Sequence, residues 1–132
     1  MGRTDDMKNL QIKNIPGKFQ FFEGKNPQYI YTGPRHSAVV TGKYSNYAEN
    51  GDLYTFGTGN WGVIGHGNED EISYPHVKKV DYFSQNKIKI KKACLGDYHS
   101  FALTENGEVY TWGFGGKKGF LGLLIKGLII LI

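Results

Sequence analysis

The feature that most constrains the fold of this chain is an internal repeat. Residues 36–41 (His-Ser-Ala-Val-Val-Thr) recur as residues 99–104 (His-Ser-Phe-Ala-Leu-Thr), and residues 49–57 recur as residues 105–113. Nine of these fifteen paired positions are identical, and the first copy carries seven extra residues between its two segments. A period of 56 or 63 residues indicates one supersecondary unit per copy, so we expect an array of similar units.

Each copy is typical of a β-hairpin. A run rich in Val, Thr or Leu is followed by Asn-Gly and then by Leu-Tyr-Thr-Phe or Val-Tyr-Thr-Trp. Asn-Gly between strand-like runs is a strong hairpin signal, and it predicts a type I′ turn in which both central residues have a positive φ. The strands do not alternate cleanly between polar and apolar residues, which indicates burial on both faces by stacked sheets.

Two further strands are predicted between the copies, at residues 76–80 and 87–91, with a turn at residues 84–86. One hairpin plus these two strands makes about four strands per period. Period and strand count together predict an all-β fold, a partial β-propeller of about two four-stranded antiparallel blades. If the two strands pair, their lysines form a basic stripe along a blade edge. The alternating strand contributes Lys87, Lys89 and Lys91.

Residues 93–104 and 106–113, together with the glycine-rich stretch 57–67, resemble the regulator of chromosome condensation repeats. The resemblance covers residues 28–122, and spacing and residue type agree in both copies. It implies a seven-bladed β-propeller. Known members include an exchange factor for the small GTPase Ran, subunits of ubiquitin ligases and scaffolds, so the resemblance indicates the fold far better than the function.

The resemblance divides the chain into three segments. Residues 1–27 form an N-terminal segment that can include a first blade strand, residues 28–122 hold two repeats, and residues 123–132 form an apolar tail that departs from the family pattern. Because a seven-bladed ring of such repeats needs about 400 residues, we expect a fragment. The missing blades would come from a longer chain or from self-assembly. The apolar run 120–132 is too short for a helix that spans a membrane, so no membrane span is expected.

Positions that recur in both copies are predicted to serve the fold. A histidine at the same position in every blade is expected to have a structural role in each blade, such as packing or hydrogen-bonding a turn. This recurrence argues against a catalytic role. The predicted structural motif positions are Gly33, His36, Gly51, Tyr54, Gly57, Gly96, His99, Gly107, Tyr110, Trp112 and Gly113.

Three patterns that could carry chemistry are better explained by structure. Residues 57–62 spell G-x-G-x-x-G, but the glycine-rich continuation is unlike the helix that a dinucleotide site needs. Cys94 is the single cysteine, which excludes an intramolecular disulfide and predicts a buried core thiol. The consecutive acids at 69–71, near His66 and His76, cannot easily converge on a metal. We therefore predict no catalytic residue, no cofactor and no metal site, and no enzyme activity for this chain.

The net charge and the N-terminal residues of the chain bear on its class of partner and its compartment. The net charge of +4, from 16 basic and 12 acidic side chains, permits a polyanionic partner without requiring one. Fourteen of the sixteen cations are lysines, whereas bidentate recognition of phosphate or guanine favours arginine. The first residues lack the apolar run of a secretory signal, so we expect an intracellular protein of the nucleus or cytoplasm.

Three functions stay open on the sequence. The leading one is a non-enzymatic protein–protein interaction module built from propeller repeats. The second, implied by the resemblance, is part of a guanine-nucleotide exchange factor for a Ran-like small GTPase. The third is association with chromatin or nucleic acid through the lysine-rich blade edge. The candidate partner contacts are Trp61, which lies in a predicted loop, and Lys87, Lys89 and Lys91.

Overall fold

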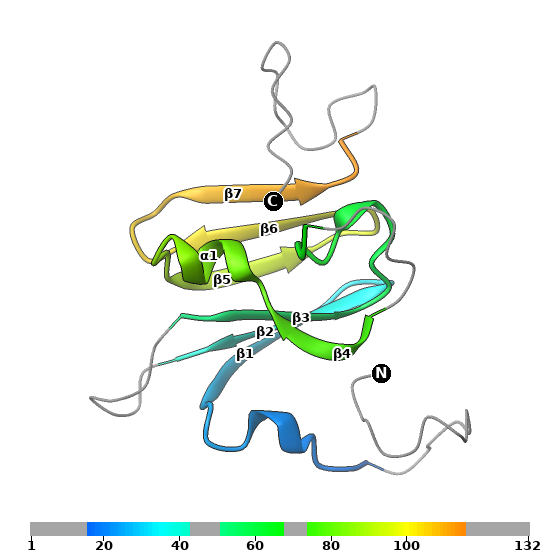
Figure 1. Ribbon diagram of the computed structural model, residues 1–132, viewed down its shortest axis with the longest axis vertical. Coiled ribbons are helices and arrows are strands. Elements are labelled where there is room, and N and C mark those ends of the chain that lie inside the picture. Colours follow the sequence, from blue (N-terminus) through cyan, green and yellow to red (C-terminus); the bar gives the residue numbers. More distant parts are fainter. Residues whose placement is uncertain (1–15, 43–50, 68–73, 116–132) are drawn as a thin grey trace.

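Two antiparallel sheets stack against each other in the computed structural model, which describes residues 16–42, 51–67 and 74–115 (Figure 1). Strands β1 to β4 form the first sheet in sequence order, and β5 to β7 form the second. We call these sheets the first and second blade. Their strands are β1 (Pro27–Thr32), β2 (His36–Thr41), β3 (Leu53–Gly57), β4 (Tyr74–Lys79), β5 (Ile90–Leu95), β6 (His99–Thr104) and β7 (Val109–Gly113). The helical elements are η1 (Gln20–Phe22), η2 (Asn60–Gly62) and α1 (Asp81–Gln85).

The predicted all-β fold is confirmed, with four strands in the first blade and three in the described part of the second. In the described segments no helix is both long and apolar enough to cross a membrane. The apolar tail predicted at residues 123–132 lies outside the described residues. Its place in the domain organisation stays a prediction.

Residues 76–80 and 87–91 do not pair, so the condition for one basic stripe is not met. β4 pairs with β3 and completes the first blade, whereas β5 pairs with β6 and begins the second. At the predicted turn, Ser84 and Gln85 instead end α1 and Asn86 caps it. The helix places Phe83 in the core between the blades at 1% exposure. Because the two strands belong to different sheets, their lysines do not form one stripe.

The two copies of the repeat have the same register. His36 pairs with Gly57 across β2 and β3, and His99 pairs with Gly113 across β6 and β7. Both glycines have a left-handed φ, of +118° and +105°. A Cβ on either one would lie 2.8 or 2.9 Å from the Cα of the histidine opposite. The Gly after the aromatic residue is therefore required by positive φ and by close approach of the backbones.

The Asn-Gly turn of the second copy has a different type from the one predicted. Gly107 has a φ of +87°, but Asn106 does not have a positive φ. The Gly107 N–H donates to the Thr104 carbonyl at 3.2 Å, and the Thr104 N–H donates to the Glu108 carbonyl at 2.9 Å. This is a three-residue loop in which only the glycine is left-handed, rather than a type I′ turn.

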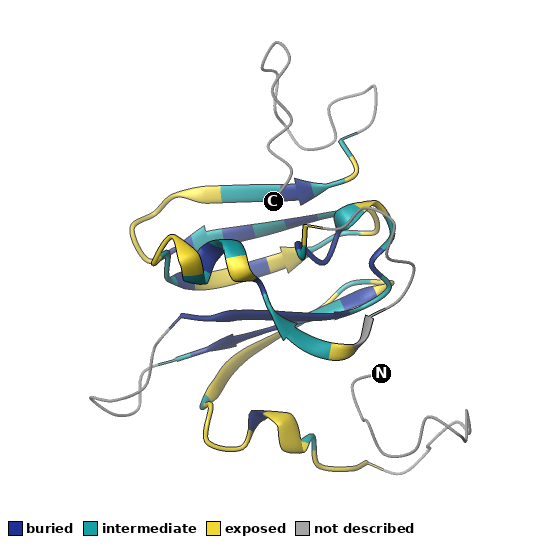
Figure 2. Cartoon of the chain, viewed as in Figure 1, coloured by how far each residue is buried: buried dark blue, intermediate teal, exposed yellow. Residues whose placement is uncertain are grey.

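The core has two parts, and the larger one fills the space between the blades (Figure 2). It contains Ala38, Val40, Leu53, Val80, Phe83, Ile90, Ala93, Ala102 and Trp112. The smaller part, which we call the outer core, covers the other face of the first blade and contains Phe22, Val39, Tyr54 and Phe56. Burial on both faces is thus confirmed for β2 and β3, whereas β6 alternates between half-buried and buried residues.

Candidate protein-interaction site

Loops from both blades meet at one end of the strands, on the right in Figure 1. The turns that lead into β2 and β6 lie here, with the loop after β3 that holds η2 and the residue after β7. The two turns are repeat equivalents: Gly33 N–H donates to the His36 carbonyl, and Gly96 N–H donates to the His99 carbonyl. The repeat thus places equivalent loops of two blades side by side.

Three exposed aromatic rings gather on these loops. The ring centroid of Trp61 lies 5.0 Å from that of Tyr98 and 5.9 Å from that of Phe114, and Tyr98 and Phe114 are 6.3 Å apart. Their exposed fractions are 43%, 37% and 41%. Large aromatic side chains usually supply buried area, so three that remain exposed together form an unusual surface.

A salt bridge joins the two blades beside the rings. Arg35 Nε donates to Asp97 Oδ1 at 3.0 Å, and the guanidinium carbon lies 5.2 Å from the centroid of Tyr98. The hydrogen bond to Asp97 is the main reason why the pKa of Arg35 is raised above its ordinary value. We call Arg35, Trp61, Tyr98 and Phe114 the Trp61 patch.

Trp61 has a left-handed backbone, with φ of 59° and ψ of 25°. This conformation is uncommon for a bulky residue. Non-glycine residues are held in such strained conformations mainly at functional sites, which makes an observed outlier a reason to suspect function.

Buried hydrogen bonds fix the loop beneath Trp61. The Val63 carbonyl accepts from Ser100 Oγ at 2.8 Å and from Trp112 Nε1 at 2.9 Å. Because the Ser100 hydroxyl donates its proton to Val63, it accepts from His36 Nε2, which is 2.7 Å away. His36 is only 2% exposed. Burial, followed by the nearby His99, lowers its pKa to about 4, so it is neutral at pH 7.

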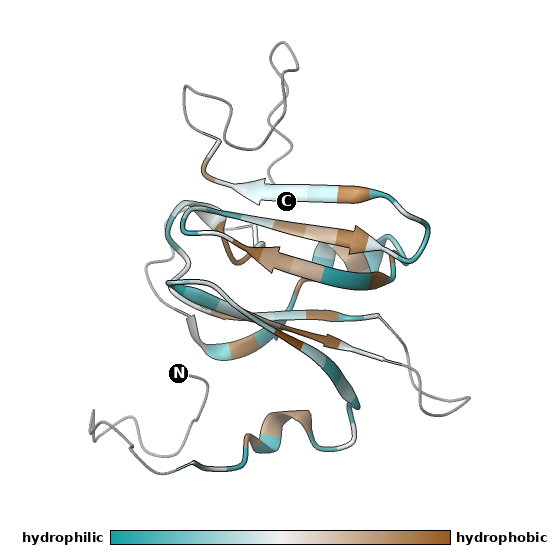
Figure 3. Cartoon of the chain, turned by 180° about the vertical axis from the view of Figure 1, so that it is seen from behind, coloured by the Kyte–Doolittle hydropathy of each residue, from teal (hydrophilic) through white to brown (hydrophobic). Residues whose placement is uncertain are grey.

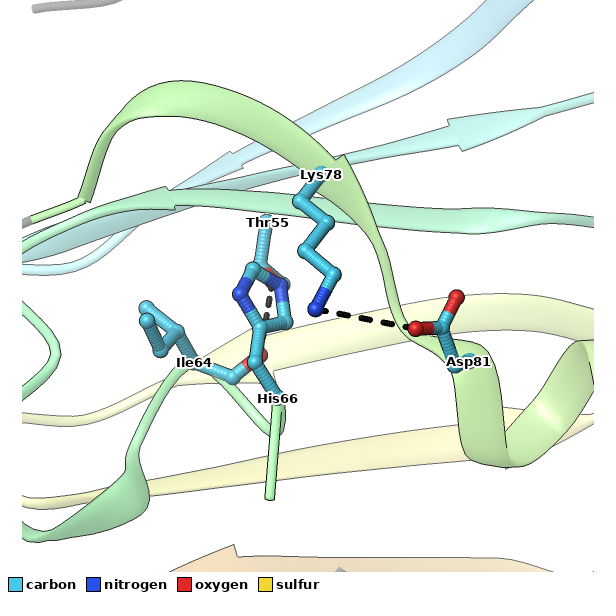
Figure 4. A network of polar contacts seen from close by, with 5 residues as sticks. All are labelled: Thr55, Ile64, His66, Lys78 and Asp81. Atoms are coloured by element: carbon cyan, nitrogen blue, oxygen red, sulfur yellow. Dashed lines mark hydrogen bonds and ion pairs between the residues drawn. The ribbon is translucent and has the colours of Figure 1, made fainter. Parts of the chain in front are cut away.

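A second histidine, the half-buried His66, lies in the same loop and contacts Thr55 (Figure 4). Thr55 Oγ1 donates to the Ile64 carbonyl at 2.6 Å and therefore accepts from His66 Nε2 at 2.8 Å. Burial lowers the pKa of His66 to about 4, and the Lys78 ammonium contributes to the shift. His66 thus donates to Thr55 and cannot act as the base that removes its proton, so the pair has a structural role.

The comparisons with known sequences identify the repeat. Two profiles of the regulator of chromosome condensation (RCC1) repeat match this chain, at residues 50–103 and at residues 90–118. The chain belongs to the RCC1 repeat family. The second match overlaps the second blade, and the first runs from the β3 hairpin of the first blade into β6.

Relatives and solved structures agree with this membership. The chain is 40% identical to the human X-linked retinitis pigmentosa GTPase regulator over 88% of this chain and 10% of that protein. It is 38% identical to the human E3 ubiquitin-protein ligase HERC2 over 73% of this chain and 2% of that one. The chain thus spans a tenth or less of these relatives.

Among solved structures, human WBSCR16 matches with a TM-score of 0.56 and 23% identity, over 76% of this chain and 24% of its own. Prp20p from Saccharomyces cerevisiae, reported with its binding properties to Gsp1p and histones, matches with a TM-score of 0.52 and 22% identity. That match covers 66% of this chain and 19% of the yeast protein. At these identities the structures bear on the fold alone.

The predicted structural motif residues of the RCC1 repeats lie in different parts of the structure. Gly33 and Gly96 lie in the turns before the histidines, and Gly51 and Gly107 close the hairpins. Tyr54 is in the outer core, Tyr110 packs against the core between the blades, and Trp112 lies within that core. That these positions act as a structural motif stays a prediction.

The predicted partner contacts are not brought together. Lys87, Lys89 and Lys91 lie where β5 begins, whereas Trp61 contacts Tyr98, which follows the other end of that strand. Sequence reasoning also missed Arg35, Tyr98 and Phe114. A signal existed for the first two, because Arg35 and Tyr98 both directly precede the repeated histidine.

Cys94 was expected in the core, but its side chain is exposed. It pairs with Phe101 on the face of the second blade that is turned away from the first, while the neighbouring Ala93 lies in the core between the blades. Successive residues of a strand point to opposite faces, so the register decides which of the two is buried.

Proposed function

We propose that this chain is a non-enzymatic protein–protein interaction module and that the Trp61 patch is its contact surface. The observation that carries the proposal is the exposed cluster of Trp61, Tyr98 and Phe114 beside Arg35. Trp, Tyr and Arg are the residues enriched where a few side chains supply most of the binding energy. Clustered exposed apolar groups on a folded protein mark binding sites.

The buried hydrogen bonds beneath the Trp61 patch favour a role in binding a partner over a role in catalysis. Its loop is held by the Val63 carbonyl and by buried Trp112, so the aromatic rings are presented on a preorganised base. Preorganisation raises affinity because less conformational freedom is lost on binding. The hydroxyl groups of Ser100 and Thr55 donate to backbone carbonyls, which leaves neither poised as a nucleophile.

We expect Trp61→Ala to remove most partner binding without unfolding the protein. Truncation of a central interface tryptophan costs about 2 kcal/mol or more, which corresponds to a loss of affinity of about thirtyfold. The test captures binding proteins on the intact chain, purifies them and titrates them against each variant. Tyr29→Ala is the matched control, since Tyr29 is 50% exposed on β1 and outside the patch. If Trp61→Ala and Tyr29→Ala bind the captured partner with the same affinity, the Trp61 patch is not the contact surface.

A second candidate is regulation of a small GTPase through the same patch. It is supported by the 40% identity to a human protein that is named a GTPase regulator. The test mixes the chain with a panel of small GTPases that carry fluorescent GDP, and follows nucleotide release and binding. We expect complex formation that Trp61→Ala weakens and Tyr29→Ala does not. If no GTPase of the panel binds the chain and none releases GDP faster, this candidate is discarded.

A further inference from the structure

Strand β1 forms an open edge of the first blade (Figure 3). It pairs with β2 on one side, and no described strand lies on its other side. Every residue of β1 except Tyr31 is exposed, and Figure 2 draws most of the strand as exposed. Tyr29 is 50% exposed and Ile30 is 71% exposed. An unpaired edge of this kind presents backbone groups with which a strand of another chain can pair.

The register of β1 shows which of its backbone groups point to the open edge. The Gly33 N–H donates to the His36 carbonyl, and Tyr31 pairs with Ala38 in the same register. Hydrogen-bonded and non-hydrogen-bonded pairs alternate along an antiparallel ladder. Tyr31 therefore bonds to β2, whereas the N–H and C=O groups of Ile30 point away from β2. Within the described residues, no other segment forms a backbone hydrogen bond with them.

The equivalent edge of the second blade is already occupied. Ala93 of β5 has the same place in its repeat as Ile30 has in β1. The backbone of Ala93 is hydrogen-bonded to the hydroxyl of Tyr31, which comes from the first blade. β7, at the other edge of the described part of the second blade, is equivalent to β3, whose second side is taken by β4. Ile30 therefore presents backbone groups at a position where the second blade has a bonded one.

The sequence of β1 also leaves its edge unprotected. β4, at the opposite edge of the first blade, contains Pro75, Lys78 and Lys79, and β5 contains Lys91 and Lys92. Lysine and proline are residues that keep edge strands from pairing with other chains. After its first residue, which is a proline, β1 contains neither proline nor a charged residue. It is thus suited to pairing with an added strand.

Exposed cations lie around this edge. Lys25 precedes β1 by two residues, and Lys91 and Lys92 lie on β5, which contacts β1. Neither strand contains an acid. The nearest acid before β1 in the sequence, Glu23, is paired with Lys18. An added strand with acidic residues at its ends therefore complements the charge around β1. A second copy of β1 is a poorer occupant, because it brings no acid.

We propose that the open edge of β1 binds an extended segment of a partner protein that carries acidic residues at its ends. The segment adds a strand to the first blade, with its backbone bonded to the N–H and C=O of Ile30 and an apolar side chain over the Ile30 side chain. Its terminal carboxylates lie near Lys25 and Lys91. In this mode of recognition the main-chain bonds give affinity and alternate side chains give specificity. The surface shares no residue with the Trp61 patch.

Peptides test the proposal on the intact chain. The probe is a fluorescein-labelled peptide in which six alternating Thr and Val residues, as many as β1 has, are flanked on each side by two glutamates. Fluorescence anisotropy measures its affinity, and we expect saturable binding. The same peptide with lysine flanks should bind about tenfold more weakly. Methylation of every backbone nitrogen in the Thr-Val repeat removes the donors for strand pairing and should also lower the affinity about tenfold.

Matched variants of the protein test the two parts of the surface. Because the Ile30 N–H points away from β2, Ile30→Pro keeps the pairing with β2 but removes a donor at the open edge. It should weaken binding of the glutamate-flanked peptide about tenfold, whereas Ile30→Thr keeps the N–H and should retain most of the affinity. Lys91→Gln should weaken binding of the glutamate-flanked peptide, and Lys78→Gln on the opposite edge is its control. Urea unfolding confirms that each variant is folded.

Four results would overturn the proposal. They are no binding of the glutamate-flanked peptide, equal binding of the methylated and unmethylated peptides, equal binding of the glutamate-flanked and lysine-flanked peptides, and self-association of the chain that Ile30→Pro abolishes. The last result would make a second copy the occupant. If Ile30→Pro does not fold, the methylated peptide decides the question of strand pairing by itself.

Discussion

Replacement of Trp112 with alanine is expected to lower the free energy of unfolding by about 3–5 kcal/mol. The indole is 1% exposed in the core between the blades, and its ring centroid lies 5.8 Å from that of Phe83. Its Nε1 also donates to the Val63 carbonyl. The substitution therefore leaves a large cavity and removes a hydrogen bond that holds the loop under Trp61. Since domains are stable by only about 5–15 kcal/mol, the substitution should remove a large fraction of the stability.

Urea unfolding followed by the fluorescence of the remaining Trp61 measures this effect. Val109→Ala on the same strand is the control, since Val109 is 67% exposed and should change stability by at most about 0.5 kcal/mol. Trp112→Phe keeps most of the packing and isolates the hydrogen bond. Equal midpoints for Trp112→Ala and Val109→Ala would contradict the described core.

Acid is expected to destabilise the fold through two histidines, the buried His36 and the half-buried His66. Burial lowers the pKa of His36 and of His66 from 6.5 to about 4. Between pH 6.5 and 4 the unfolded chain therefore binds more protons than the folded one, so stability falls as pH falls. The slope approaches about 1.4 kcal/mol per pH unit for each histidine in this window.

Urea titrations at several values between pH 7 and 5 measure the slope, in a range where carboxylates contribute little. His36→Gln and His66→Gln should each remove about half of the slope, and the double variant should remove nearly all of it. An identical slope in the double variant and the unmodified chain would show that other groups cause the acid sensitivity. The same series reports on the hydrogen bond between the blades, because protonation of His36 would leave a buried Nδ1–H without a partner in the described structure.

Most of the Trp61 patch could not be predicted from the sequence. Trp61 could be singled out because a tryptophan in a glycine-rich loop is conspicuous. Its companions Tyr98 and Phe114 lie 37 and 53 residues further along the chain. Nothing local indicates that three loops meet at one end of the blades. Only the stacking of two repeats brings the rings within about 6 Å of one another.

The sequence by itself determined the repeat, the hairpin in each copy, the glycine that follows the aromatic residue and hence the propeller-type fold. These features depend on positive φ and on residue patterns within one hairpin, which are short-range properties of the chain. The tertiary structure alone decided that β4 ends one blade and β5 begins the next, that Phe83 enters the core and that Cys94 is exposed. The reason is physical: a strand has two faces, and which one is buried depends on the sheet that packs against it.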